Sequence, residues 1–241
     1  MALELYLDLF SQPCRSVYMF AKKNNIPFEF KKVSLMHGEH FGDQFGKINM
    51  MRKVPALRDG DFCLAESIPI MLYLAEKFQT PEFWYPTDIH QRARINEYLS
   101  WQHTAIRMYR SKMFWLRLLI PKMIGMEVPK EKMDGALEDL NNSLNLIEEK
   151  FLQDRLFFGG DQISLADLVA IVEVMQPVGA GLDVFNGRPK LSAWRDRVRV
   201  SIDMELFDEA NRDILGAQEI MGKIDPGTLE LFKPKILRFY Y

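Results

Sequence analysis

A hydroxyl and a thiol lie close together near the start of the chain, in Ser11-Gln12-Pro13-Cys14. Pro13 is typical of the first turn of a helix, where its missing N–H costs nothing. A helix N-terminus carries a partial positive charge and favours an anion such as a thiolate. Ser11 lacks the acidity of a thiol, so we expect it either to cap this helix or to stabilise the thiolate of a bound molecule. A charge-assisted hydrogen bond of about 1.5–3 kcal/mol lowers the pKa of such a thiol by about one to two units.

Cys14 supports a different chemistry. The same four residues resemble a Cys-x-x-Cys redox motif in which Ser11 replaces the first, nucleophilic cysteine. A glutaredoxin-like thiol–disulfide oxidoreductase would use Cys14, although its place inside the predicted helix favours a buried, inert thiol. The other cysteine, Cys63, lies in a predicted strand, and we expect it in the core. Two cysteines make no disulfide framework, which favours a reducing compartment.

A second group of polar residues lies further along the chain. Ser67 opens a predicted helix, where it suits a carboxylate, and Glu66 beside it can pair with an ammonium group. This pair fits the head of an α-amino acid, and a plain helix cap is the alternative. His40 and Lys53 are candidates for a second carboxylate or are solvated surface residues. His37 and His40 are three residues apart, but no third ligand has convincing spacing, so we expect no metal.

The elements that would position these residues alternate between strand and helix over the first eighty residues. We predict strands at Leu3–Leu9, Phe28–Val33, Val54–Leu57 and Asp61–Leu64, and helices at Cys14–Asn25 and Glu66–Phe78. The order β-α-β and then β-β-α is typical of the thioredoxin-like fold. In that fold Pro55 is expected in cis, which X-Pro bonds adopt at low cost. The N–H and C=O groups of Val54 would then be free to pair with a bound peptide.

Only helical patterns follow a linker that we place at Thr80–Gln91. The predicted helices are Ala93–Lys112, Lys130–Phe151, Leu165–Met175, Leu191–Val200 and Leu206–Ala217. We therefore predict two domains, a thioredoxin-like α/β domain at residues 1–82 and an all-α domain at residues 88–241. Ser164 and Asp167 form a capping box before an almost wholly apolar helix, a motif that serves folding. A last apolar segment from Asp225 either covers a pocket or packs on the body.

The composition excludes several classes of protein. The 241 residues are 48% hydrophobic and 27% charged, which is ordinary for a folded globular chain. A net charge of −2 gives no positive field for a polyanion, which argues against nucleic-acid binding even along the basic and aromatic stretch around Arg107. No run of about 20 apolar residues predicts a membrane span. The N-terminus does not resemble a signal peptide, so we expect a cytoplasmic protein without a membrane partner.

The combination of motifs resembles the cytosolic glutathione transferases, and most closely their theta class. The likeness covers nearly the whole chain. It rests on Leu5–Leu9 with Ser11–Arg15, on Lys53–Leu57 with Asp59-Gly60, on Glu66-Ser67, on Ile163–Asp167 and on Gly187–Leu191 with Trp194-Arg195. Each piece is weak by itself, but their combination is highly specific.

The resemblance implies roles for individual residues. Ser11 would donate a hydrogen bond to the glutathione sulfur, and Arg107 matches an arginine near the thiol, so these two are the expected catalytic residues. Val54 would pair with the cysteinyl backbone of glutathione. The remaining expected glutathione-binding residues are Glu66 and Ser67 at the γ-glutamyl end, His40 and Lys53 at the glycyl carboxylate, and Gln12.

The implied activity is conjugation of reduced glutathione to small hydrophobic electrophiles, such as haloalkanes and epoxides, with some reduction of organic hydroperoxides. The resemblance also implies detoxification, a homodimer, and glutathione as co-substrate without a metal or bound cofactor. The tail resembles the theta-class extension over the active site, but Lys235 stands about where a mammalian member has a tryptophan, which bears on substrate range. Two alternatives stay open, a glutaredoxin-like oxidoreductase using Cys14 and a non-catalytic binding module with this fold.

Overall fold

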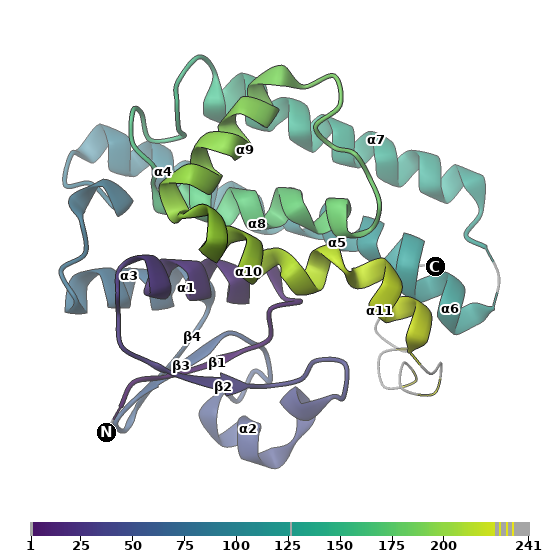
Figure 1. The fold of residues 1–241 in the computed structure, drawn as a ribbon, viewed down its shortest axis with the longest axis horizontal. Coiled ribbons are helices and arrows are strands. Elements are labelled where there is room, and N and C mark those ends of the chain that lie inside the picture. Colours follow the sequence, from purple (N-terminus) through teal and green to yellow (C-terminus); the bar gives the residue numbers. More distant parts are fainter. Residues whose placement is uncertain (1, 126, 225–226, 228–229, 231–232, 234–241) are drawn as a thin grey trace.

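The computed structural model describes residues 2–125, 127–224, 227, 230 and 233, without the side chains of residues 107–110 and 124. Its N-terminal part is an α/β domain and the rest is helical, which confirms the predicted fold class (Figure 1). The elements of the first part are β1 (Glu4–Leu7), α1 (Gln12–Lys23), β2 (Glu29–Lys32), η1 (Glu39–Phe41), α2 (Asp43–Ile48), β3 (Ala56–Asp59), β4 (Phe62–Ala65) and α3 (Ser67–Lys77).

The four strands form one mixed sheet in the order β2-β1-β3-β4. β1 runs parallel to β2, and the β1–β3 and β3–β4 pairs are antiparallel, as the thioredoxin-like order predicts. α1 and α3 cover one face, and α2 lies on the other (Figure 1). Alternation along β1 places Leu5 and Leu7 in the main core, while Tyr6 contacts Phe45 of α2 on the opposite face.

The helical part begins at α4, after the short turn η2 (Glu82–Trp84). Its elements are α4 (Ile89–Thr104), α5 (Ile106–Phe114), the π-helical turn η3 (Trp115–Leu119), α6 (Ile120–Ile124), α7 (Lys130–Leu146), the π-helical turn η4 (Ile147–Leu152), α8 (Leu165–Gly179), α9 (Pro189–Ile202), α10 (Met204–Leu215) and α11 (Ala217–Lys223). The single helix predicted at Ala93–Lys112 was wrong, because two helices meet at Ala105. Asp88 caps α4 by accepting a hydrogen bond from the Gln91 N–H at 2.9 Å, so the linker is shorter than predicted.

α8 is the central helix of the second part, and nearly all of its side chains are buried. The predicted capping box at its start is present. Asp167 is completely buried and accepts hydrogen bonds from the Ser164 N–H (3.0 Å), the Phe158 N–H (2.9 Å) and Nε1 of Trp194 (2.9 Å). This carboxylate therefore joins α8 to the preceding loop and to α9, beyond the local cap.

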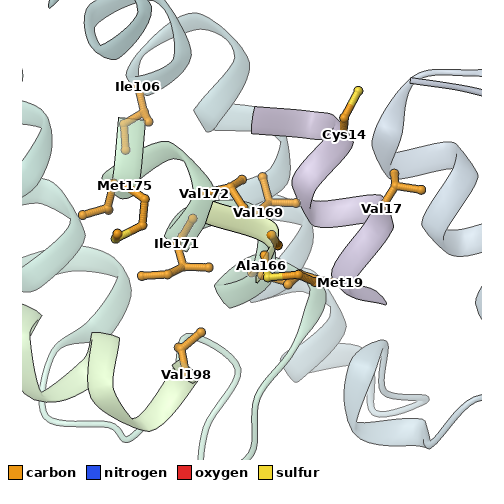
Figure 2. Close-up of a cluster of buried hydrophobic side chains, with 14 of the residues drawn as sticks. Cys14, Val17, Met19, Ile106, Ala166, Val169, Ile171, Val172, Met175 and Val198 are labelled. Carbon is orange, nitrogen blue, oxygen red and sulfur yellow. The ribbon is translucent and has the colours of Figure 1, made fainter. Parts of the chain in front are cut away.

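The two parts of the chain meet where α1 packs against α8 (Figure 2). Apolar side chains from both helices, including Met19 of α1 and Ala166 and Val169 of α8, are buried there. The one cation within this interface, among the residues that the structure describes, is Arg15, which is fully buried. Its hydrogen bonds reach the segment just before Ser11.

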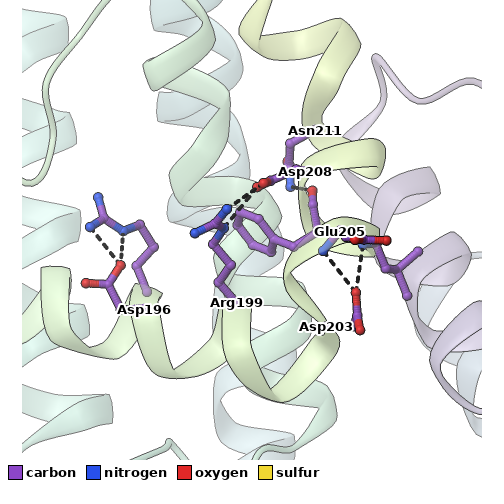
Figure 3. A network of polar contacts seen from close by, with 9 residues as sticks. Asp196, Arg199, Asp203, Glu205, Asp208 and Asn211 are labelled. Carbon is purple, nitrogen blue, oxygen red and sulfur yellow. Dashed lines mark hydrogen bonds and ion pairs between the residues drawn. The ribbon is translucent and has the colours of Figure 1, made fainter.

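α9 and α10 meet at a sharp turn at Asp203, which adopts a positive φ of 100°. The Asp203 carboxylate accepts hydrogen bonds from the N–H groups of Glu205 (2.9 Å) and Leu206 (3.2 Å) and thereby caps α10. Arg199 of α9 pairs with Asp208 of α10 on the surface (Figure 3). The turn is thus determined by local polar contacts.

One further sequence prediction is contradicted by the structure, and another falls on residues that the structure does not describe. Cys63 is exposed, so its predicted place in the core was wrong. It lies on β4, one of the two edge strands of the sheet, whose residues are exposed or half-buried. The predicted tail segment from Asp225 and the position Lys235 lie outside the described residues.

Candidate functional site

A cavity of about 850 Å³ lies between the α/β part and the helical part. Every predicted site residue whose side chain the structure describes lines it: Ser11, Gln12, His40, Lys53, Val54, Glu66 and Ser67. These residues come from four separate segments of the first part. The side chain of Arg107 lies outside the described residues, although its backbone belongs to α5.

Ser11 lies at the junction of β1 and α1, as predicted, and lines the cavity. It is the N-cap residue of α1, but its side chain makes no capping hydrogen bond. The Ser11 N–H donates to the Asp8 carbonyl at 2.9 Å, and the Ser11 carbonyl accepts from the Arg15 N–H at 3.1 Å. The backbone of Ser11 is thus fixed on both sides, while its hydroxyl is not used to cap the helix.

Cys14 is fully buried in α1. Burial raises the pKa of its thiol to about 12, against smaller opposing effects of hydrogen bonds to Asp8 and Ser11. At neutral pH the thiol is therefore protonated and shielded from solvent. A redox nucleophile needs an accessible thiolate, so these properties argue against the glutaredoxin-like alternative.

The two cysteines are therefore expected to react very differently with a thiol reagent. Iodoacetamide added to the native protein at pH 8 should label Cys63, which is exposed, and leave Cys14 unmodified. Peptide mass spectrometry measures both sites, with protein labelled in denaturant as the control in which both react. Labelling of Cys14 at the rate of Cys63 in the native protein would contradict this prediction.

Glu66 and Ser67 stand where β4 ends and α3 begins. Glu66 has the dihedral angles φ 70° and ψ 124°, in a region that residues other than glycine rarely adopt. Such strained residues are concentrated at functional sites, where the surrounding structure maintains them. Ser67 is only 5% exposed, whereas the Glu66 side chain is exposed beside it. The N-terminus of α3 and the Glu66 carboxylate therefore meet at one wall of the cavity.

The loop before β3 brings basic groups to the cavity. Asn49 is buried, donates to the Lys53 carbonyl at 2.7 Å and accepts from the Met51 N–H at 3.0 Å. Lys53 is exposed at the cavity wall, and the His40 ring is buried and contacts Phe41. The Val54–Pro55 bond is cis, which confirms that prediction. Val54 precedes β3, whose sheet pairing begins at Ala56.

The helical part supplies the other wall, which is more apolar. Phe114, Trp115 and Leu119 come from the end of α5 and from η3, and Met221 comes from α11. Polar exceptions are His103, Ser111 and Gln176. Gln12 reaches across the cavity, where its Nε2 donates to Oγ of Ser111 at 3.2 Å. The cavity therefore has a polar end on the first part and an apolar end on the second, with Ser11 on its wall.

Two residues that support Ser11 have roles that the sequence did not indicate. Arg15 donates to the carbonyls of Leu9 (2.9 Å) and Phe10 (3.2 Å), the two residues just before Ser11. Its second nitrogen donates to the Val172 carbonyl (3.0 Å) and to Oε1 of Gln176 (2.8 Å), both on α8. Burial lowers the pKa of Arg15 to about 10. These partners are distant in sequence, so no local pattern could have indicated them.

Asp8 holds the same segment from the other side. Its carboxylate accepts from the Phe10 N–H at 3.0 Å and from the Leu35 N–H at 2.7 Å. Burial raises the pKa of Asp8, and these two N–H groups oppose that effect. Asp8 therefore joins the segment that carries Ser11 to the loop after β2, which also lines the cavity.

The part of the chain that the structure describes has neither a membrane-crossing helix nor a cluster of metal ligands. No helix among residues 2–125 and 127–224 is long and apolar enough to cross a membrane. No three His, Cys, Asp or Glu side chains in the described part of the chain are grouped so that they could hold a metal ion.

Comparison with known proteins places these features in context. The family models "Glutathione S-transferase, N-terminal domain" and "Glutathione S-transferase, C-terminal domain" match residues 2–76 and 106–201. Glutathione S-transferase theta-1 of Homo sapiens is 49% identical over 237 residues, which is 98% of each chain. Theta-3 of Mus musculus is 48% identical over 233 residues, 97% of each chain.

Solved structures give the same result. Human glutathione-S-transferase T1-1 in its apo form matches with a TM-score of 0.93 at 48% identity, over 99% of this chain and 100% of that one. A human theta-class glutathione transferase in complex with the glutathione conjugate of 1-menaphthyl sulfate matches with a TM-score of 0.92 at 45% identity, over 99% and 100% of the two chains.

Proposed function

This chain belongs to the theta class of the glutathione S-transferase family and conjugates glutathione, and we propose that Ser11 stabilises the reacting thiolate while the apolar end of the cavity receives small haloalkanes and epoxides. The observation that carries this proposal is the position of Ser11. Its hydroxyl does not cap α1, and it lies on the wall of a cavity with a polar and an apolar end. A nucleophilic sulfur held there meets an electrophile from the helical side.

The polar end suits the two ends of glutathione. Glu66 would pair with the γ-glutamyl ammonium group, and Ser67 with the N-terminus of α3 would hold the γ-glutamyl carboxylate. Lys53 and His40 would bind the glycyl carboxylate. Val54 would pair through its backbone with the cysteinyl residue. Gln12, whose side chain donates to Ser111, would also bind glutathione. Arg107 would lie near the glutathione sulfur and take part in catalysis.

The reaction is a nucleophilic displacement. The thiolate of glutathione donates an electron pair to an electrophilic carbon, so that a C–S bond forms while the C–halogen bond breaks and halide leaves with its electron pair. With an epoxide, a C–O bond breaks and the resulting alkoxide takes a proton. The protein contributes the orientation of the two reactants and stabilisation of the thiolate. Reduction of organic hydroperoxides would use the same thiolate.

The proposal includes the organisation of the protein. We assign glutathione binding to residues 1–82 and the electrophile pocket to residues 88–241. The family resemblance supports a homodimer that acts in the cytosol in detoxification. Light scattering of the purified protein tests the dimer, since the expected mass is twice that of one chain.

A turnover assay tests the function. The purified protein is incubated with glutathione and either iodomethane or a nitrophenyl epoxide, and the conjugate is measured by mass spectrometry. We expect formation of the thioether well above the uncatalysed rate. Binding of glutathione without any acceleration would instead support the non-catalytic binding module.

Lys53 provides a test of the glycyl carboxylate site. In Lys53→Met, we expect KM for glutathione to rise about two- to fivefold with kcat little changed, because an exposed ion pair contributes modestly to binding. Lys47→Met is the matched control, since Lys47 is an exposed lysine of the neighbouring α2 that does not line the cavity. Initial rates at varied glutathione concentration give both constants. An equal rise of KM in the two variants would argue against a specific role of Lys53.

A further inference from the structure

On the side of the helical part, the apolar lining of the cavity comes from two segments that lie far apart in the sequence. One segment is the end of α5 with η3, which supplies Phe114, Trp115 and Leu119, and the other is α11, which supplies Met221. Met221 is only 3% exposed. α11 has seven residues, too few for a helix that is stable by itself. Its position therefore depends on contacts with its neighbours.

Lys122 of α6 makes the contact at the end of α11. Its Nζ donates to the Met221 carbonyl at 2.7 Å and to the Gly222 carbonyl at 2.6 Å. The last carbonyls of a helix lack partners within the helix and carry partial negative charge, so an ammonium group suits them. One of these carbonyls belongs to the residue whose side chain lines the cavity. Because α6 directly follows η3, Lys122 thus joins the two segments that line the apolar end.

The segment that carries Lys122 is itself fixed. Arg117 of η3 donates through Nε to the Ala180 carbonyl at 2.9 Å, at the end of α8. The start of α11 also lies against this end of α8, because a Cβ added at Gly181 would approach the Gln218 side chain to 2.9 Å. Both η3 and the first turn of α11 are therefore placed by α8, and Lys122 holds the other end of α11.

From these contacts we propose that Lys122 is a positioning residue that determines which electrophiles the enzyme accepts. By holding the end of α11, it keeps Met221 against the apolar end of the cavity and limits the length of the electrophile. This inference rests on the proposed function. Without Lys122, α11 moves away from η3, so that long electrophiles gain space and short ones lose their contact with Met221.

The experiment compares electrophiles of two lengths. The specificity ratio is kcat/KM for 1-iodohexane divided by kcat/KM for iodoethane, at saturating glutathione. In Lys122→Met, which keeps most of the length of the side chain but cannot donate, we expect this ratio to rise about tenfold, because hydrogen bonds from a charged group contribute that much or more. KM for glutathione should stay within about twofold, since Lys122 is remote from the polar end.

Three variants separate this role from a general loss of structure. Lys122→Arg can donate to both carbonyls and should restore the wild-type ratio, and Lys122→Gln should give an intermediate one. Lys223→Met is the matched control, because Lys223 is on α11 but pairs with Glu219 on the exposed side. An unchanged ratio in both Lys122→Met and Lys122→Gln would overturn the inference and leave the proposed function standing. Absence of turnover in the wild-type protein would instead refute the proposed function.

Discussion

Replacing Ser11 by alanine is expected to lower kcat/KM for glutathione conjugation by roughly ten- to one-hundred-fold, with KM for glutathione within about twofold of wild type. The hydroxyl lies at the start of α1 and makes no capping hydrogen bond. A hydrogen bond from it to a thiolate contributes about 1.5–3 kcal/mol, and this contribution is lost only in the step that needs the thiolate. Binding through the polar end of the cavity does not depend on it.

The pH dependence gives the decisive measurement. If Ser11 stabilises the thiolate, the pKa of bound glutathione lies below that of free glutathione, and Ser11→Ala raises it by about one to two units. At saturating glutathione, the rising limb of kcat/KM for the electrophile against pH then moves to higher pH in the variant, and the two proteins differ least in alkaline solution. Ultraviolet absorbance of the thiolate in the enzyme–glutathione complex follows the same titration directly.

Ser11→Thr is the control for this prediction. Threonine keeps the hydroxyl at the same place, so most of the activity and the acidic pKa of the bound thiol should return. Equal activity of Ser11→Ala and wild type, with the same pH profile, would remove Ser11 from the mechanism. The thiolate would then have to be stabilised by other groups at the site.

The features that were predictable from the sequence depend on short-range chemistry. The capping box of Ser164 and Asp167 and the cis bond before Pro55 are each determined by a few adjacent residues and a strand–helix order. The mixed sheet could be predicted from alternating apolar residues and from the turn signal Asp59-Gly60. Most of the predicted site residues begin or precede an element whose type was clear, and strand order then brings such ends together. His40, in a segment without a clear pattern, and Arg107, inside a predicted helix, were assigned from the family resemblance alone.

The features that were missed depend on contacts between distant parts of the chain. The π-helical turns η3 and η4 continue ordinary helical patterns, so the sequence shows no sign of them. Cys63 occupies a strand pattern, but burial of a strand residue depends on whether its strand is central or at the edge. Lys122 and Arg15 donate to backbone carbonyls. Every residue has a backbone carbonyl, so the sequence does not show which ones these side chains will contact.

Arg15→Met is expected to lower the free energy of unfolding by about 3–5 kcal/mol, the largest effect on stability that we predict. The guanidinium group is fully buried and makes hydrogen bonds with three carbonyls and with Gln176, from both parts of the chain. Its removal leaves the Val172 carbonyl and Gln176 buried without their donor, and the carbonyls of Leu9 and Phe10 half-buried without theirs. A buried acceptor that loses its partner costs about 1–3 kcal/mol. Urea unfolding followed by circular dichroism measures the change.

The same variant tests whether Arg15 also positions Ser11. Because Arg15 holds the carbonyls of Leu9 and Phe10, the folded Arg15→Met protein should show a lower kcat at a temperature well below its Tm. Arg15→Lys should recover only part of this kcat, since an ammonium group cannot reach all four acceptors. Arg199→Met, which breaks a surface pair with Asp208, is the matched control and should change neither stability nor kcat appreciably. A stability loss in Arg15→Met no greater than in Arg199→Met would mean that the α1–α8 interface is held by its apolar side chains alone.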